Sequence, residues 1–131
     1  MVIFVNGTFD IVHTGHIKLL NYAKSLGDIL YVAIDSDDGV RELKGSSRPI
    51  NNQLERKLML ENLKPVDNVC IFGSSDELVS IIRKLNVDIM VKGSDYIGKP
   101  IVGSEYCKKI VFYEILNGYS TTKKIQSIIN R

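Results

Sequence analysis

Residues 2–34 read VIFVNGTFDIVHTGHIKLLNYAKSLGDILYVAI, and this stretch decides the fold. The apolar run from Val2 to Val5 predicts a strand, and apolar side chains at the helical period from His16 to Leu26 predict a helix, with Gly27 placed to end it. A second apolar run, Ile29 to Ile34, predicts another strand. A strand, a helix and a strand within about 35 residues make the unit that joins two parallel strands.

The same alternation continues to the end of the chain. Further strands are expected at Val69 to Phe72, Ile89 to Lys92 and Lys109 to Ile115. Further helices are expected at Gln53 to Leu63, at Glu77 to Leu85 after a cap at Ser75 or Asp76, and at Ser120 to Ile129 with Ile125, Ile128 and Ile129 facing inward. The sequence therefore predicts one α/β domain over residues 1–131, a doubly wound, Rossmann-like sheet of about five parallel strands.

The polar stretch from Asp35 to Asn52 interrupts this pattern. Its first part is charged, and its second part contains Gly45, Ser46, Ser47 and Pro49, which favour a turn or a loop. We expect a short helix followed by a mobile loop. Loops in such folds commonly carry function.

Composition excludes several classes of protein. The chain has 131 residues, of which 44% are hydrophobic and 24% charged, so it is neither disordered nor collagen-like. A formal net charge of +2 predicts no nucleic-acid or anionic membrane surface. No apolar run reaches the ~18 residues of a membrane span and no secretion signal is visible, so we expect a soluble, cytoplasmic protein. Cys70 and Cys107 are expected to be reduced, buried thiols.

Two motifs lie between the first strand and the first helix. Gly7-Thr8-Phe9-Asp10 is followed by His13-Thr14-Gly15-His16, at the edge of the sheet where the backbone N–H groups of a helix point outward. Gly7 lets the backbone approach a phosphate, Gly15 lets the helix begin against one, and His13 and His16 aim at the same place. The pair could instead bind zinc, but no third ligand of Cys or His type accompanies it, or the histidines could be unrelated surface residues.

Together these motifs resemble the cytidylyltransferase-like nucleotidyltransferases, whose hallmark is G-T-F-D followed shortly by H-x-G-H. The resemblance extends over nearly the whole chain, through Leu43 to Pro49 with Glu55-Arg56, Val91 to Tyr96, Ile101 to Ser104 and Gly118 to Lys123. Within that family, the set is most similar to the adenylyltransferases of ADP-heptose synthesis. Glycerol-3-phosphate cytidylyltransferases are the near relatives.

The resemblance implies a reaction without a covalent enzyme intermediate. A phosphorylated small molecule attacks the α-phosphorus of a nucleoside triphosphate and pyrophosphate leaves. Because the acceptor phosphate is already an anionic nucleophile, the protein has to supply alignment and charge neutralisation instead of a general base. Mg²⁺ is implied by the triphosphate, and no metal site of the protein's own is expected.

The resemblance also implies a role for each motif. His13, His16 and Lys44 are the expected catalytic residues, with His16 stabilising the charge of the transition state and Lys44 reaching over the phosphates from the mobile loop. Nucleotide contacts are expected from Gly7, Thr8, Phe9, Gly15, His16, Lys92, Gly93, Asp95, Ser120, Thr121 and Thr122. Acceptor contacts are expected from Asp10, Asp35, Asp38, Lys44 and Arg48. The alternatives are ordinary ones: Ser120 and the aspartates near the second strand can cap helices, and Asp95 can form a turn.

One departure bears on the nucleotide. The cytidylyltransferase relatives carry R-T-x-G-I-S-T-T, whereas this chain reads I-L-N-G-Y-S-T-T over residues 115–122. The missing arginine favours ATP over CTP. We therefore expect transfer of AMP to a sugar 1-phosphate, a heptose phosphate, made by a separate sugar kinase. The alternatives are a cytidylyltransferase for glycerol-3-phosphate or another polyol phosphate, and a noncatalytic nucleotide sensor. A homodimer is expected, because so small a chain gains burial by pairing.

Overall fold

The computed structural model describes residues 1–114 and 121–130, and it contains one five-stranded sheet. All strand pairs are parallel and the order across the sheet is β3-β2-β1-β4-β5. The strands are β1 (Val2–Gly7), β2 (Ile29–Asp35), β3 (Asn68–Phe72), β4 (Ile89–Gly93) and β5 (Lys109–Tyr113). The predicted doubly wound α/β fold is confirmed, and the order of the strands reverses direction between β1 and β4, where ligands bind in folds of this type.

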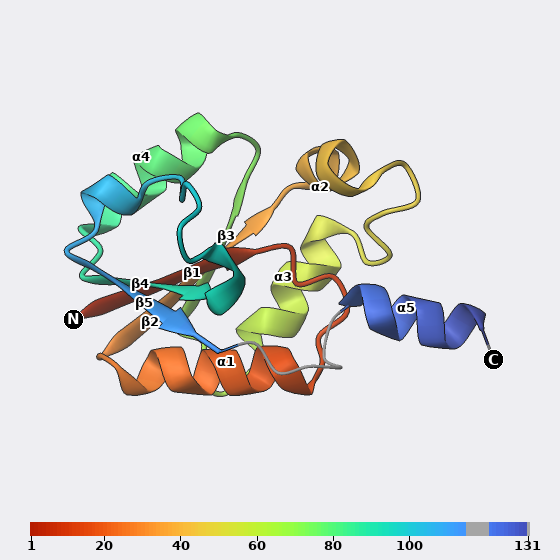
Figure 1. Cartoon of the computed structure of the whole chain (residues 1–131), viewed down its shortest axis with the longest axis horizontal. Helices are drawn as coiled ribbons and strands as arrows, with labels where there is room; N and C mark the ends of the chain where they lie inside the picture. The colour runs from red at the N-terminus through yellow and green to blue at the C-terminus, as the bar shows by residue number, and fades with distance from the viewer. Residues whose placement is uncertain (115–120, 131) are drawn as a thin grey trace.

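Helices cover both faces of the sheet (Figure 1). They are α1 (Thr14–Ser25), α2 (Asp37–Lys44), α3 (Gln53–Glu61), α4 (Ser75–Leu85) and α5 (Thr121–Ile129), with short 3-10 turns η1 (Ser94–Tyr96) and η2 (Ser104–Tyr106). Each helix lies within about two residues of its predicted position. The cap of α4 differs from the prediction, because Ser74 accepts the N–H of Glu77 through its Oγ at 3.2 Å. Neither Ser75 nor Asp76 is the cap, since both already lie inside the helix.

The strands of the sheet send alternate side chains to opposite faces. In β1, Ile3 and Val5 pack with Leu20 of α1 and Leu60 of α3, whereas Phe4 packs with Ile82 of α4. Burying each such side chain contributes about 1.5–3 kcal/mol of transfer free energy, which makes the two apolar layers the main source of stability. The sheet thus separates an α1 side from an α4 side.

The last helix corrects one prediction. Ile125, Ile128 and Ile129 were expected to face the core, but Ile128 and Ile129 are exposed. The physical reason is position, because α5 extends beyond the ends of α1 and α3 and does not lie over the sheet (Figure 1). The predicted end of the fifth strand at Ile115 and the start of this helix at Ser120 lie outside the described residues.

None of the helices formed by residues 1–114 and 121–130 has the length and apolar content needed to cross a lipid bilayer.

Candidate active site

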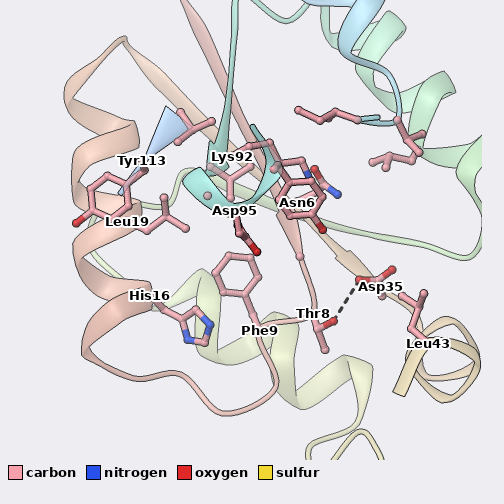
Figure 2. A pocket seen from close by; sticks show the side chains of 18 of the residues that line it. Asn6, Thr8, Phe9, His16, Leu19, Asp35, Leu43, Lys92, Asp95 and Tyr113 are labelled. Carbon is pink, nitrogen blue, oxygen red and sulfur yellow. Dashed lines mark hydrogen bonds between the residues drawn. The ribbon is translucent and has the colours of Figure 1, made fainter. Parts of the chain in front are cut away.

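A cavity of about 650 Å³ opens at the carboxyl edge of β1, β2 and β4 (Figure 2). Most of the predicted site residues line it, although they come from distant parts of the chain: Gly7, Thr8, Phe9, His13, Gly15, His16, Asp35, Lys44, Lys92, Gly93 and Asp95. Apolar side chains from α1, β5 and α4 complete the wall. Three predicted residues, Asp10, Asp38 and Arg48, are not part of the lining.

The two histidines form the beginning of α1. His13 is the N-cap, and its Nδ1 accepts the N–H of Gly15 at 3.1 Å. Nδ1 of His16 accepts the N–H of His13 at 3.2 Å, which closes a reciprocal capping box. Because Nδ1 is the hydrogen-bond acceptor in both rings, each neutral imidazole carries its proton on Nε2. The rings stack with centroids 3.9 Å apart.

His16 is held neutral. Burial, followed by the nearby His13 and Lys44, lowers the pKa of His16 from 6.5 to about 4. At neutral pH the side chain therefore offers an uncharged N–H donor to the cavity. Such a donor can bind phosphate oxygen without the cost of burying another cation beside Lys44.

Gly7 makes room for an aromatic ring. Phe9 adopts a left-handed backbone conformation with a φ of 50°, which folds its buried ring back under Gly7. A Cβ at Gly7 would lie 3.1 Å from that ring, closer than ordinary van der Waals contact. The Phe9 ring also packs against His16, with centroids 4.9 Å apart, so the turn supports the His16 side chain.

Asp10 and Arg48 lie beside the cavity and hold a loop. The buried Asp10 carboxylate accepts Arg48 Nε at 3.0 Å and the backbone N–H groups of Ile50 and Asn51, each at 2.8 Å. The turn after β1 is thereby fixed to the segment between α2 and α3. Within the described residues Nη2 of Arg48 is buried and has no hydrogen-bond partner, so its contact with an acceptor phosphate stays a prediction.

Arg56 supports the site from outside the cavity, and the sequence analysis, which named it only within a motif, gave it no role. Its side chain is completely buried and donates to the carbonyl oxygens of Thr8 at 3.0 Å, Asp35 at 2.7 Å and Asn51 at 3.0 Å. It also pairs with Asp37 at 2.9 Å. Arg56 therefore joins the ends of β1 and β2 to the start of α3. Its spacing could have indicated that it is buried, because Arg56 lies four residues before Leu60 and both are on the inward face of α3.

The cationic residues of the cavity differ in burial. Lys44 is the last residue of α2, not part of a loop as predicted, because the helix continues to Gly45 as its C-cap. Its pKa is lowered by burial and by Arg48, and Asp10 and Asp35 oppose that shift. Lys92 is only 9% exposed, its pKa is lowered by burial, and its Nζ lies 4.6 Å from the centre of the Tyr96 ring.

Asp35 faces these cations, whereas Asp38 does not. Burial raises the pKa of the Asp35 carboxyl, and Oγ1 of Thr8 donates to it at 3.4 Å (Figure 2). Asp38 is exposed on the outer side of α2 and pairs with Arg41.

The predicted anion site at the last helix is only partly described. Ser120 lies outside the described residues. Thr121 and Thr122 form the first residues of α5, but their side chains are not described.

Comparisons with known proteins place the chain in a family. The Cytidylyltransferase-like family model matches residues 4–127. Curated proteins named "Bifunctional protein HldE" are similar to the chain: that of Helicobacter hepaticus is 45% identical over 97% of this chain and 26% of its own length. That of Campylobacter curvus is 48% identical over 97% of this chain and 27% of its own length. The chain thus spans about a quarter of the length of these relatives.

A solved structure shares the fold. The crystal structure of the lipopolysaccharide core biosynthesis protein from Thermoplasma volcanium superimposes with a TM-score of 0.70 at 24% identity, over 89% of this chain and 98% of that one.

Proposed function

The chain belongs to the cytidylyltransferase-like family of nucleotidyltransferases, and from this premise we propose that it transfers AMP from ATP to a sugar 1-phosphate, a heptose 1-phosphate. The observation that carries the proposal is the pair of capping histidines, whose Nε2–H groups stand at the N-terminus of α1 in a cavity that also holds Lys44 and Lys92. Imidazole N–H donors, a helix terminus and an ammonium group are what a triphosphate and a second phosphate need when they meet.

The step needs no general base. A nonbridging oxygen of the acceptor phosphate forms a bond to the α-phosphorus, while the bond from that phosphorus to the oxygen that bridges to the β-phosphate breaks. Pyrophosphate leaves with the electron pair, and no proton has to move. His16 and His13 donate to oxygens around the α-phosphorus, and Lys44 neutralises the repulsion between the two approaching anions.

Mg²⁺ is proposed to arrive with the triphosphate. Among the described residues there is no group of three or more His, Cys, Asp or Glu side chains that could hold a metal ion by itself. Mg²⁺ would need few protein ligands, because it keeps several waters. It supplies further neutralisation of the charge on the leaving pyrophosphate.

The choice of ATP rests on the sequence. Residue 115 is isoleucine where the cytidylyltransferase relatives carry arginine, and the motif set is most similar to the heptose phosphate adenylyltransferases. Transfer of CMP to glycerol-3-phosphate is the second candidate. We further propose that the reaction takes place in the cytoplasm, that the enzyme is a homodimer, and that a sugar kinase supplies the sugar 1-phosphate.

Pyrophosphate release tests the proposal. ATP, CTP, GTP and UTP are each combined with D-glycero-D-manno-heptose 1-phosphate, mannose 1-phosphate and glycerol-3-phosphate in the presence of Mg²⁺. Release with ATP and the heptose phosphate is expected. Release only with CTP and glycerol-3-phosphate would establish the second candidate. If triphosphate binds and no acceptor gives turnover, the noncatalytic sensor is favoured.

A His16→Ala variant separates an enzyme from a sensor. Removing one donor to the transition state typically lowers the rate by about 100- to 1,000-fold. We expect that loss in turnover, with triphosphate binding measured by calorimetry largely retained. An equal loss in binding and turnover would mean that His16 acts in binding alone.

A further inference from the structure

The cavity has two sides with different chemistry. On the α1 side, the residues around His16 include Phe9, Leu19 and Tyr113, which are aromatic or apolar (Figure 2). On the α4 side, Asn6 and Lys92 lie near the centre of the sheet edge, and Asp35 lies apart from them, beside Thr8 and Leu43 (Figure 2). The two sides share the catalytic centre between them, so each is suited to a different reactant.

The register of the strands puts these three polar residues on one face of the sheet, with Asn6 beside Lys92 and Asp35 two residues further along, level with Thr8. Phe4, Ala33 and Met90 belong to the core cluster on the α4 side. Because side chains alternate along a strand, the residues two positions later, Asn6, Asp35 and Lys92, point to the same face. Phe4 pairs with Met90 across β1 and β4, and continuing that register by two residues places Asn6 beside Lys92.

Asn6 has an unmet hydrogen-bonding requirement. Within residues 1–114 and 121–130, its Oδ1 is buried and has no hydrogen-bond partner, although the side chain lines the cavity. A buried polar atom without a partner is costly and uncommon in native proteins. A ligand group that donates a hydrogen bond would satisfy it.

The identity of that group follows from donor and acceptor chemistry. A carboxamide oxygen accepts hydrogen bonds only, and an ionised phosphate also accepts only, so Oδ1 cannot bind a phosphate oxygen. A sugar hydroxyl can donate. The Asp35 carboxylate is likewise an acceptor, while Lys92 is a donor, so the three groups together can bind neighbouring hydroxyls that both give and receive hydrogen bonds.

The walls of this side fit a sugar as well. Phe72 and Leu78 line it from β3 and α4, and Ile101 and Val102 line it from the segment before η2. Apolar walls around a few placed polar groups are typical of small-molecule sites. The C–H faces of a sugar ring can pack on such walls while its hydroxyls reach the strand ends.

We propose that Asn6, Asp35 and Lys92 form the subsite for the hydroxyl groups of the sugar acceptor, and that Asn6 is a specificity-determining residue within it. This inference rests on the proposed function. It moves Lys92 from the nucleotide contacts expected from the sequence to the acceptor, and it leaves the apolar α1 side, between Leu19 and Tyr113, for the nucleotide base.

The test compares Asn6→Leu with the wild type in steady-state kinetics. Leucine has a similar volume and cannot accept a hydrogen bond. With ATP, Mg²⁺ and D-glycero-D-manno-heptose 1-phosphate, we expect the KM for the heptose phosphate to rise about tenfold to a hundredfold. The KM for ATP should change less than about threefold. Asn21→Leu, on the exposed face of α1, is the matched control and should leave both KM values unchanged.

Deoxy analogues of mannose 1-phosphate sharpen the test. Removing the one hydroxyl that Asn6 binds should abolish the difference between wild type and Asn6→Leu, whereas removing any other hydroxyl should preserve it. A rise in the KM for ATP instead would overturn the inference, because Oδ1 would then bind an amino group of the base. If Asn6→Leu weakens the reaction by the same factor with every deoxy analogue, Asn6 has a structural role and the inference is overturned.

Failure of the proposed function gives a different result. If the wild type turns over glycerol-3-phosphate and no sugar phosphate, the proposed substrate is wrong. A rise in the KM for glycerol-3-phosphate in Asn6→Leu would then keep Asn6 in a subsite for acceptor hydroxyls. An unchanged KM would overturn the inference. If calorimetry shows that the wild type binds ATP but none of the phosphorylated sugars or polyols, the hydroxyl subsite is excluded together with the substrate.

Discussion

The neutral form of His16 caps α1 through its Nδ1, and the same side chain lines the cavity. Its Nδ1 must stay unprotonated to accept the N–H of His13, and its Nε2–H is then directed away from that bond. Burial and two neighbouring basic side chains keep the pKa of His16 at about 4. The same features that begin α1 therefore fix the tautomer that the proposed contact with a phosphate oxygen needs.

This arrangement predicts how stability depends on pH. Between pH 6.5 and about 4 the unfolded imidazole takes up a proton that the folded one does not, so the free energy of unfolding falls as pH falls through this range. At pH 5 the loss from this group amounts to about 2 kcal/mol, and it levels off below about pH 4. Urea denaturation of the wild type and of His16→Asn at pH 7 and pH 5 measures it. The variant should lose less stability between the two pH values, and an equal loss in both proteins would contradict the assignment.

Arg56 provides the second prediction at this scale. Arg56→Met leaves the Asp37 carboxylate and three buried carbonyl oxygens without their donor, so we expect a loss of about 3–5 kcal/mol in the free energy of unfolding. Arg41→Met is the matched control, because Arg41 forms an exposed pair with Asp38 and its removal should cost less than about 1 kcal/mol. The two midpoints in urea check this. If Arg56→Met and Arg41→Met unfold at similar urea concentrations, the buried hydrogen bonds of Arg56 contribute no more to stability than the exposed pair of Arg41.

The segment between α2 and α3 is fixed to the site by one carboxylate. Asp10 accepts two backbone N–H groups and Arg48 Nε, which replaces the flexible connection expected from Gly45, Ser46 and Ser47. The position of Lys44 at the mouth of the cavity depends on this element, since Lys44 directly precedes that segment.

We therefore expect Asp10→Asn to loosen the segment without unfolding the sheet. Asparagine keeps the size of the side chain but loses the charge and one of the two acceptor oxygens. Trypsin should then cleave after Lys44 faster than in the wild type, as followed by mass spectrometry. Asp76→Asn, an exposed change on α4, is the control. Unchanged cleavage at Lys44 would mean that Arg48, Ile50 and Asn51 hold the segment by other contacts.

The elements show what a sequence can and cannot predict. The period of apolar residues placed all five strands and the helices between them, because burial on two faces of a sheet imposes that pattern. The motifs also predicted that His16, Asp35 and Lys92 share one cavity, since parallel strands end at one edge. The exposure of Ile128 and Ile129 was not predictable, because a helix has the same spacing of apolar residues whether or not it packs on the core. The hydrogen bonds of Asp10 and Arg56 were equally hidden, since they join segments about 40 residues apart.

The whole molecule leaves a row of apolar side chains exposed on one helix. Leu54, Leu58 and Met59 project from α3 and are 69%, 61% and 52% exposed. A domain of this size already buries a modest fraction of its surface, so covering such a row by a second copy would add stability.

We expect the enzyme to sediment at twice the 14.7 kDa mass of the chain, with α3 in the contact between the two copies. Leu58→Lys introduces a charge that would be buried at that contact, so it should shift the protein to the monomer. Ile97→Lys changes an exposed apolar residue outside α3 and should leave the mass unchanged. Sedimentation equilibrium over a range of concentrations measures both. A wild type that sediments as a monomer would refute the dimer, whereas a dimer that persists in Leu58→Lys would place the contact elsewhere on the surface.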